Sequence, residues 1–190
     1  MTTKTSCRWF RQARLSIRSL RRWTEMRHTL AVLVENRPGV LVHISGLIAR
    51  RAFNIESITA GYTEEADITR ITIVVEGDNR SLEQVVNQLS KLVDVIKIVE
   101  LTSEPSIERE LALIKVKANP ETRSDIVDIV EIFRAKIVDV NRETMVIELT
   151  GEETKIDALC EVLKDHGIVE MVRTGKVALS RRPGAAKETE

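Results

Sequence analysis

The 190 residues suffice for one medium domain or two small ones, and 43% hydrophobic with 31% charged residues is the composition of an ordinary globular protein. No apolar run approaches the roughly 20 residues that cross a bilayer, which excludes an integral membrane protein. The formal net charge is zero and only 3% of the residues are aromatic, so the chain lacks the basic face and the stacking side chains of a nucleic-acid binder.

The first 25 residues differ from the rest of the chain in charge. They carry seven basic side chains and one acid, a local charge of +6, which leaves −6 on the other 165 residues. This Arg-rich, acid-poor composition is typical of an organelle transit peptide. An arm that docks on an acidic partner, or translation from a start upstream of Met26, explains it as well. We expect a basic extension over residues 1–25 outside the folded core, and a cytoplasmic protein unless this extension directs import into an organelle.

In the first half of the remaining chain, the hydrophobic period switches regularly between about 2, typical of strands, and about 3.6, typical of helices. An apolar run over residues 28–35 predicts a strand, which the breaker Asn36-Arg37-Pro38-Gly39 ends. Apolar residues from Val40 to Ala52 then recur at helical spacing. The pattern continues with two strands, a second helix and a fourth strand, over residues 54–62, 68–76, 82–89 and 93–101.

The order of strand, helix, strand, strand, helix and strand then occurs a second time, from residue 111 to residue 179. It comprises a strand over 111–118, a helix from Asn119-Pro120, a hairpin over 137–140 and 145–149, a helix around 156–163 and a strand over 168–179. Such a repeat predicts two domains. Both match the split βαβ pattern, so we expect an α+β protein with two ferredoxin-like βαββαβ domains. We place them at residues 26–102 and 109–180, with a linker over 102–108 and a flexible tail over 181–190.

No catalytic constellation stands out in this sequence. His28, His43 and His166 lie in separate elements, and we expect each to be solvated or locally hydrogen-bonded. Metal-ligand spacings and glycine-rich phosphate loops are missing as well. Cys7 and Cys160 are too few for a disulfide framework, so we expect reduced thiols, with Cys160 a small core residue. The sequence therefore predicts no catalytic residue and no metal site.

The loop between the first strand and the first helix is the best candidate binding element. Pro38 at a helix start loses no hydrogen bond, and Gly39 lets a ligand approach the backbone. The free amides of the first helical turn form an anion site that suits a carboxylate. On spacing alone, an Asx turn at Asn36 and relief of backbone strain at Gly39 explain the loop at least as well. Asn54, at the start of the next strand, is by itself explained as a turn residue.

Several ordered segments, from Met26 to about Arg182, are similar to the small regulatory subunit of acetolactate (acetohydroxyacid) synthase. The most specific are Asn36-Arg37-Pro38-Gly39-Val40-Leu41, Arg51-Ala52-Phe53-Asn54-Ile55-Glu56-Ser57-Ile58 and Arg70-Ile71-Thr72-Ile73, followed by residues 88–95, 108–116, 132–140 and 173–181. The resemblance implies an ACT domain in the first half and a second, ACT-like domain in the other.

The resemblance also implies a non-catalytic chain. It would activate a separate large subunit, which carries thiamine diphosphate, Mg²⁺ and FAD, and it would confer valine feedback inhibition on branched-chain amino acid biosynthesis. This chain would hold no cofactor itself. Two ACT domains would pair edge to edge in a homodimer, with valine at the seam between them. By the same resemblance, valine would contact Asn36, Gly39, Val40 and Leu41 of one chain and Asn54 and Ile55 of its neighbour.

Other classes of function remain open at this stage. The main alternative is a stand-alone ACT-type amino-acid sensor that regulates another enzyme or a transcription factor. An RNA-binding ferredoxin-like module would need aromatic side chains on its strands, and Tyr62 alone does not supply them. An independent enzyme would have to turn over pyruvate by itself.

Overall fold

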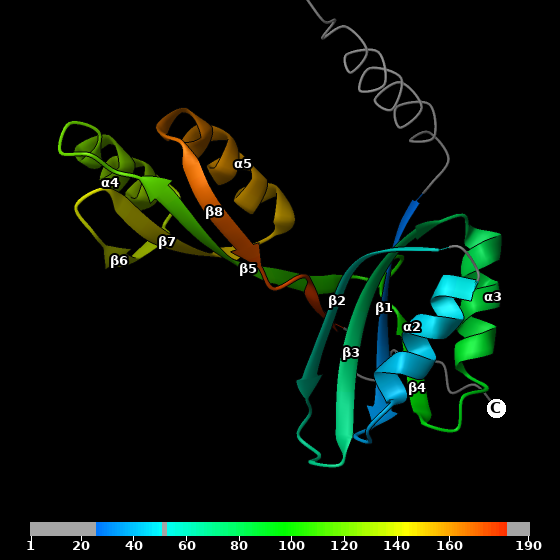
Figure 1. Cartoon of the computed structure of the whole chain (residues 1–190). Helices are drawn as coiled ribbons and strands as arrows, with labels where there is room; N and C mark the ends of the chain where they lie inside the picture. Colours follow the sequence, from blue (N-terminus) through cyan, green and yellow to red (C-terminus); the bar gives the residue numbers. More distant parts are fainter. Residues whose placement is uncertain (1–25, 51–52, 182–190) are drawn as a thin grey trace, which may run out of the picture.

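The computed structural model describes residues 26–50 and 53–181 (Figure 1). The predicted extension over residues 1–25 and all but the first residue of the predicted tail lie outside this part of the chain. Of the helices that the structure describes, none is long and apolar enough to cross a membrane.

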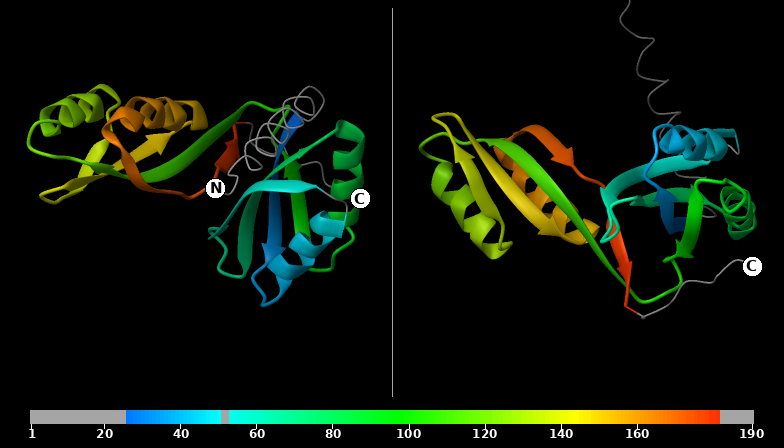
Figure 2. Two further views of the ribbon diagram at one scale, coloured as in Figure 1. Left: turned by 45° about the horizontal axis from the view of Figure 1, so that its top comes forward. Right: turned by 90° about the horizontal axis from the view of Figure 1, so that it is seen from below.

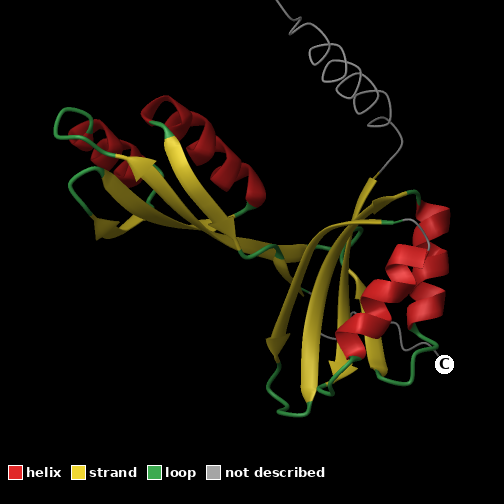
Figure 3. Cartoon of the chain, viewed as in Figure 1, coloured by secondary structure: helices red, strands yellow, loops and turns green. Residues whose placement is uncertain are grey.

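The first unit is a four-stranded antiparallel sheet with two helices on one face (Figure 3). The strands lie in the order β2-β3-β1-β4, so β2 and β4 are the edge strands. The helix α2 contacts β2, whereas α3 contacts β4. The elements in chain order are β1 (Met26–Glu35), α2 (Val40–Arg50), β2 (Asn54–Tyr62), β3 (Ile68–Gly77), α3 (Asn79–Leu89) and β4 (Val95–Glu100).

Alternation along the strands assigns one face of this sheet to the helices. Leu30, Val32 and Val34 of β1 are buried in one core together with Ile44 and Ile48 of α2. Burying each such side chain stabilises the fold by about 1.5–3 kcal/mol relative to an exposed position. The intervening residues of β1 point to the other, helix-free face.

The second unit repeats the arrangement with the strand order β6-β7-β5-β8. Its core includes Ile114 and Ile147 from the sheet and Ile126 and Leu159 from the helices. The α+β fold with two ferredoxin-like units is thereby confirmed. The elements are β5 (Ser106–Lys117), α4 (Arg123–Ile132), β6 (Lys136–Val140), β7 (Thr144–Gly151), α5 (Glu153–Leu163), the 3-10 turn η1 (Lys164–His166), β8 (Ile168–Arg173) and β9 (Val177–Ser180).

The predicted boundaries are wrong by most at three places. The strand β5 begins at Ser106, inside the segment predicted as a linker. The helix α4 begins at Arg123 rather than at Asn119-Pro120, because Asn119 Oδ1 accepts the Thr122 amide at 2.8 Å in a preceding turn. The strand predicted over 168–179 is interrupted between β8 and β9, where Gly175 has φ of +84°. Such a φ takes the chain out of the sheet without disturbing the hydrophobic alternation on either side.

The interruption frees β9 to join the two units. β9 pairs with the first residues of β5, from Ser106 opposite Ser180 to Arg109 opposite Val177, and forms a two-stranded ribbon. Ala178 of this ribbon is only 5% exposed and packs against Ala31 and Leu101 of the first unit. Figure 2 shows β9, in red, beside the first sheet. The ribbon therefore covers part of the helix-free face, and the two units share a packed junction.

Candidate functional site

The loop from Asn36 to Gly39 is held by its own backbone. The Asn36 amide donates to Asp67 O at 2.7 Å, and the Arg37 amide donates to Glu35 O at 2.9 Å. Gly39 has φ of +92°, and its carbonyl accepts the first hydrogen bonds of α2. A Cβ added at Gly39 would meet no atom within 4 Å. Glycine is thus required here by backbone conformation, and the space beside it is open to a ligand.

The first turn of α2 presents poorly satisfied amides. The Val40 amide reaches Arg37 O only at 3.5 Å, and within the described residues the amides of Gly39 and Leu41 donate to no backbone carbonyl. The first turn carries no acidic residue. The positive end of the helix dipole is therefore not neutralised by a side chain of the same turn and can attract an anion.

One side of α2 faces β4 and the other faces the β2 edge of the sheet. His43 points toward the β4 side, because its Nδ1 lies 3.3 Å from Asp94 Oδ2 just before that strand. At 3.6 residues per turn, Leu41 lies about 200° around the helix from His43. Leu41 therefore points toward the β2 side, where its side chain is 46% exposed. The exposed Leu41 side chain therefore lies between the start of α2 and the β2 edge of the sheet.

The structure brings Asn36, Gly39, Val40 and Leu41 together but places the other two predicted residues elsewhere in the chain. Asn36 lies beside Asp67 at the start of β3, whereas Asn54 lies opposite Glu76 at its end. The Asn54 Nδ2 donates to Glu76 Oε2 at 3.4 Å, on the helix-free face. Ile55 points to the other face and packs against the first core. Within one chain, Asn54 and Ile55 are thus at the opposite end of the sheet.

His28 and Cys160 occupy structural positions. His28 is buried, with Nε2 3.2 Å from Gly77 O. Cys160 packs against the second core, with Sγ 3.4 Å from Met171 Sδ. Burial raises the pKa of the Cys160 thiol, which makes it a poor nucleophile at neutral pH. In the part of the chain that the structure describes, no three His, Cys, Asp or Glu side chains gather as a metal site.

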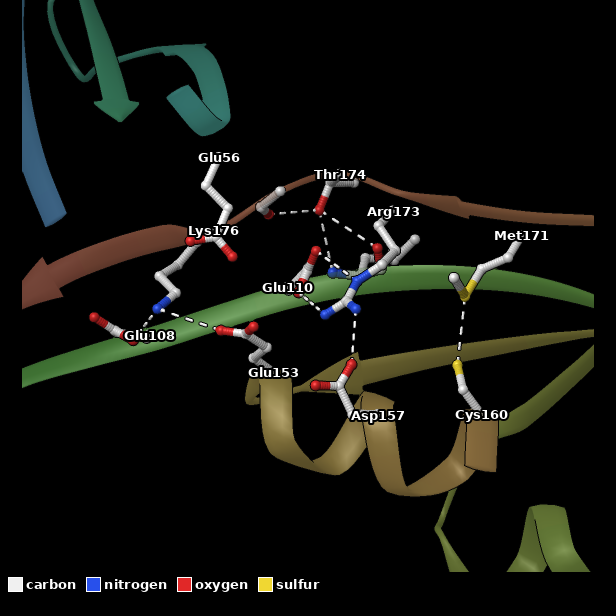
Figure 4. Close-up of polar contacts among 12 residues, drawn as sticks. Glu56, Glu108, Glu110, Glu153, Asp157, Cys160, Met171, Arg173, Thr174 and Lys176 are labelled. Carbon is white, nitrogen blue, oxygen red and sulfur yellow. Dashed lines mark hydrogen bonds and ion pairs between the residues drawn. The ribbon is translucent and has the colours of Figure 1, made fainter. Parts of the chain in front are cut away.

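Sequence reasoning missed a cluster of ion pairs at the junction (Figure 4). Arg173 donates to Glu110 at 2.9 and 2.6 Å and to Asp157 at 2.8 Å. The hydrogen bond to Glu110 raises the pKa of Arg173, although burial acts in the opposite direction, so Arg173 stays positively charged. Lys176 Nζ lies 2.9 Å from Glu108 and 3.8 Å from a Glu153 oxygen.

These charges come from three distant stretches of the chain, residues 108–110, 153–157 and 173–176, and no local spacing in the sequence predicts that they meet. Glu110, Glu153, Arg173 and Lys176 line a cavity of about 380 Å³ between the two units. Arg27 and Glu56, from the first unit, reach the same place. Only the tertiary structure shows that these side chains meet.

Comparison with known proteins identifies one family over both units. Residues 30–97 match the model of the AHAS small subunit-like ACT domain, and residues 109–182 match the model of the small subunit of acetolactate synthase. The crystal structure of the acetolactate synthase small subunit from Thermotoga maritima is 42% identical, with a TM-score of 0.77, and the match covers 83% of this chain and 99% of that one.

Curated relatives agree with these matches. A probable acetolactate synthase small subunit from Archaeoglobus fulgidus is 56% identical over 156 residues, 82% of this chain and 98% of the relative. The small subunit from Mycolicibacterium smegmatis is 52% identical over 163 residues, 84% of this chain and 96% of the relative. With both units matched in order, the chain belongs to the acetolactate synthase small-subunit family: it is the regulatory partner of the catalytic large subunit and not the catalytic subunit itself.

Proposed function

We propose that this chain activates the acetolactate synthase large subunit and makes it sensitive to valine, which binds at the β2 edge of the ACT sheet. The observation that carries the proposal is the open helix start at Gly39, next to the exposed Leu41 and an edge strand. A small amino acid presents the matching groups, a carboxylate and a short apolar side chain.

A homodimer through β2 accounts for the separation of the site residues. Two β2 strands paired antiparallel around a twofold axis would extend the sheet and protect both free edges. Antiparallel pairing sets the start of one β2 against the end of the other. Asn54 and Ile55 of one chain would then lie near Asn36 and Gly39 of its neighbour, although they are far apart in either chain alone.

The bound valine would be recognised through its two polar ends and its side chain. Its carboxylate would face the amides of Gly39, Val40 and Leu41. Asn36 of one chain and Asn54 of the neighbour would hold the polar head, since side-chain amides offer both donors and acceptors. Leu41 and Ile55 would contact the isopropyl group. A difference of one methylene is worth only about 1–3 kcal/mol, so we expect weaker binding of leucine and isoleucine as well.

Because the ligand touches two chains, its binding energy can bias how they are juxtaposed. Coupling of this kind typically amounts to about 1–3 kcal/mol. In this proposal thiamine diphosphate, Mg²⁺ and FAD belong to the large subunit, and the residues of this chain only bind the effector and position the partner.

The test is acetolactate formation by the purified large subunit, alone and with this chain, titrated with valine. We expect low activity alone, higher activity with the chain, and inhibition by valine only in the complex. Activation without any effect of valine would overturn the valine site. No activation and no association with the large subunit would instead favour the stand-alone sensor.

A further inference from the structure

Arg27 is an ion-pair bridge between the two units. It lies on β1, where its guanidinium contacts Glu56 of β2 and donates to both carboxylate oxygens of Glu153, at 2.7 and 2.8 Å. Glu153 is the first residue of α5, in the second unit. Among the residues that the structure describes, Arg27 alone forms salt bridges with side chains of both units.

The part of β2 that Arg27 contacts adjoins the proposed valine site. The register of β2 against β3 shifts between Ile55 and Ser57, so Glu56 is the extra residue of a β-bulge. Bulges bend a strand and redirect its side chains. Glu56 thereby reaches Arg27 from a position directly after Ile55, and a displacement of Asn54 and Ile55 would move it.

Further along β2, direct contacts with the second unit follow. The Thr59 hydroxyl donates to Thr174 O at 3.2 Å. A Cβ at Gly175 would lie 2.9 Å from Thr59 Oγ1 and 3.2 Å from Ser57 Cβ, so only glycine allows this approach. The next residue, Lys176, returns to Glu153. Glu56, Arg27, Glu153, Lys176 and the Gly175 backbone thus close a ring between β2 and the second unit.

The positive charge of Arg27 holds the carboxylates of Glu56 and Glu153 together in this ring. Burial raises the pKa of Glu56, and the charges of Glu153 and Glu76 raise it further, whereas Arg27 opposes them. The charge of Arg27 thus stabilises two carboxylates that would otherwise repel each other. The adjacent cavity of about 380 Å³ leaves the ring room to open when that charge is lost.

We propose that Arg27 is a positioning residue that couples the valine site to the second unit: valine held against Asn54 and Ile55 fixes Glu56, and Glu56 fixes the second unit through Arg27 and Glu153. This inference rests on the proposed function. Arg27 is not among the residues that would contact valine, so its loss should leave the ligand contacts in place and remove the response of the second unit.

The test uses the full-length chain with the variants Arg27→Gln and Arg27→Lys. The matched control is Arg109→Gln, because Arg109 has nearly the same side-chain exposure, 49% against 48%, but its partner Glu152 lies in the same unit. Valine affinity is measured by calorimetry, and amide hydrogen exchange is followed with and without valine at residues 36–41 and at residues 151–157 and 173–176. Valine inhibition is measured in the complex with the large subunit.

In the wild-type chain and in Arg109→Gln, valine should slow exchange at both sets of residues. In Arg27→Gln the valine affinity should stay within threefold and residues 36–41 should remain protected. The effect on residues 151–157 and 173–176 should disappear, and the valine concentration for half inhibition should rise at least fivefold. Arg27→Lys should restore part of both responses, because it keeps the positive charge.

Protection of the second unit that persists in Arg27→Gln would overturn the coupling role while leaving the valine site intact. If Arg27→Gln is misfolded by circular dichroism, Glu153→Gln breaks the bridge from the other side and decides the question by the same measurements. No protection anywhere in the wild-type chain would instead overturn the valine site, and the coupling role with it.

Discussion

Replacing Gly39 by asparagine and by aspartate separates the backbone role of this residue from the electrostatics of its site. Both side chains have the same shape, and a Cβ at this position meets no atom within 4 Å. Both also pay the same conformational cost at φ of +92°, about 1–2 kcal/mol for an L-residue in the left-handed region. The two variants therefore differ in the charge beside the amides of α2 and in the donor that the asparagine amide adds, both of which disfavour a carboxylate ligand in the aspartate variant.

The charge has opposite effects on stability and on binding. A carboxylate at a helix start stabilises the helix by about 0.3–1 kcal/mol, so Gly39→Asp should be at least as stable as Gly39→Asn. Two carboxylates about 4 Å apart repel by about 1 kcal/mol in bulk water and by about 4 kcal/mol at an effective dielectric constant of 20. Valine should therefore bind Gly39→Asp between about 5-fold and about 1000-fold more weakly than Gly39→Asn.

Calorimetry with valine and urea denaturation of both variants provide the measurement. Activation of the large subunit should persist in both, while half inhibition of the aspartate variant should require a valine concentration higher by the same factor. Equal valine affinity in the two variants would refute the placement of the ligand carboxylate at this helix start. A further comparison at high salt should narrow the gap between them, since screening weakens exposed charge repulsion.

Three other substitutions test separate parts of the structure. Asn54→Ala should weaken valine binding in calorimetry more than it weakens dimerisation in sedimentation, and the reverse order would place Asn54 in the interface only. Glu110→Ala should lower the free energy of unfolding by about 2 kcal/mol in urea titrations, because it leaves the half-buried Arg173 with one partner. Burial, aided by Glu153 and Glu76, raises the pKa of Glu56 despite Arg27, so the folded state keeps this proton to a higher pH than the unfolded state. Stability should therefore fall as the pH rises from about 4.5, the usual pKa of a glutamate, through the raised pKa of the folded state. Glu56→Gln should flatten that part of the profile, and an unchanged profile would contradict the assignment.

Local pattern was sufficient for most of the architecture. The alternation that buries Leu30, Val32 and Val34 and the helical spacing of Ile44 and Ile48 are properties of short segments, and each segment has one face that must be covered. The loop at Gly39 was found for the same reason, because a breaker followed by a helix start is contiguous in the chain. Two such sets of elements in the same order were enough to predict two ferredoxin-like units.

Long-range packing decided what local pattern could not. The strand β8 ends before Gly175, whose positive φ cannot be predicted from the spacing of apolar residues. The packing of Ala178 depends on a surface that Ala31 and Leu101 form. The bridge at Arg27 joins residues 29 and 126 positions away. Contacts at such separations are set by how two folded sheets meet, and the sequence alone determines only which faces are available to meet.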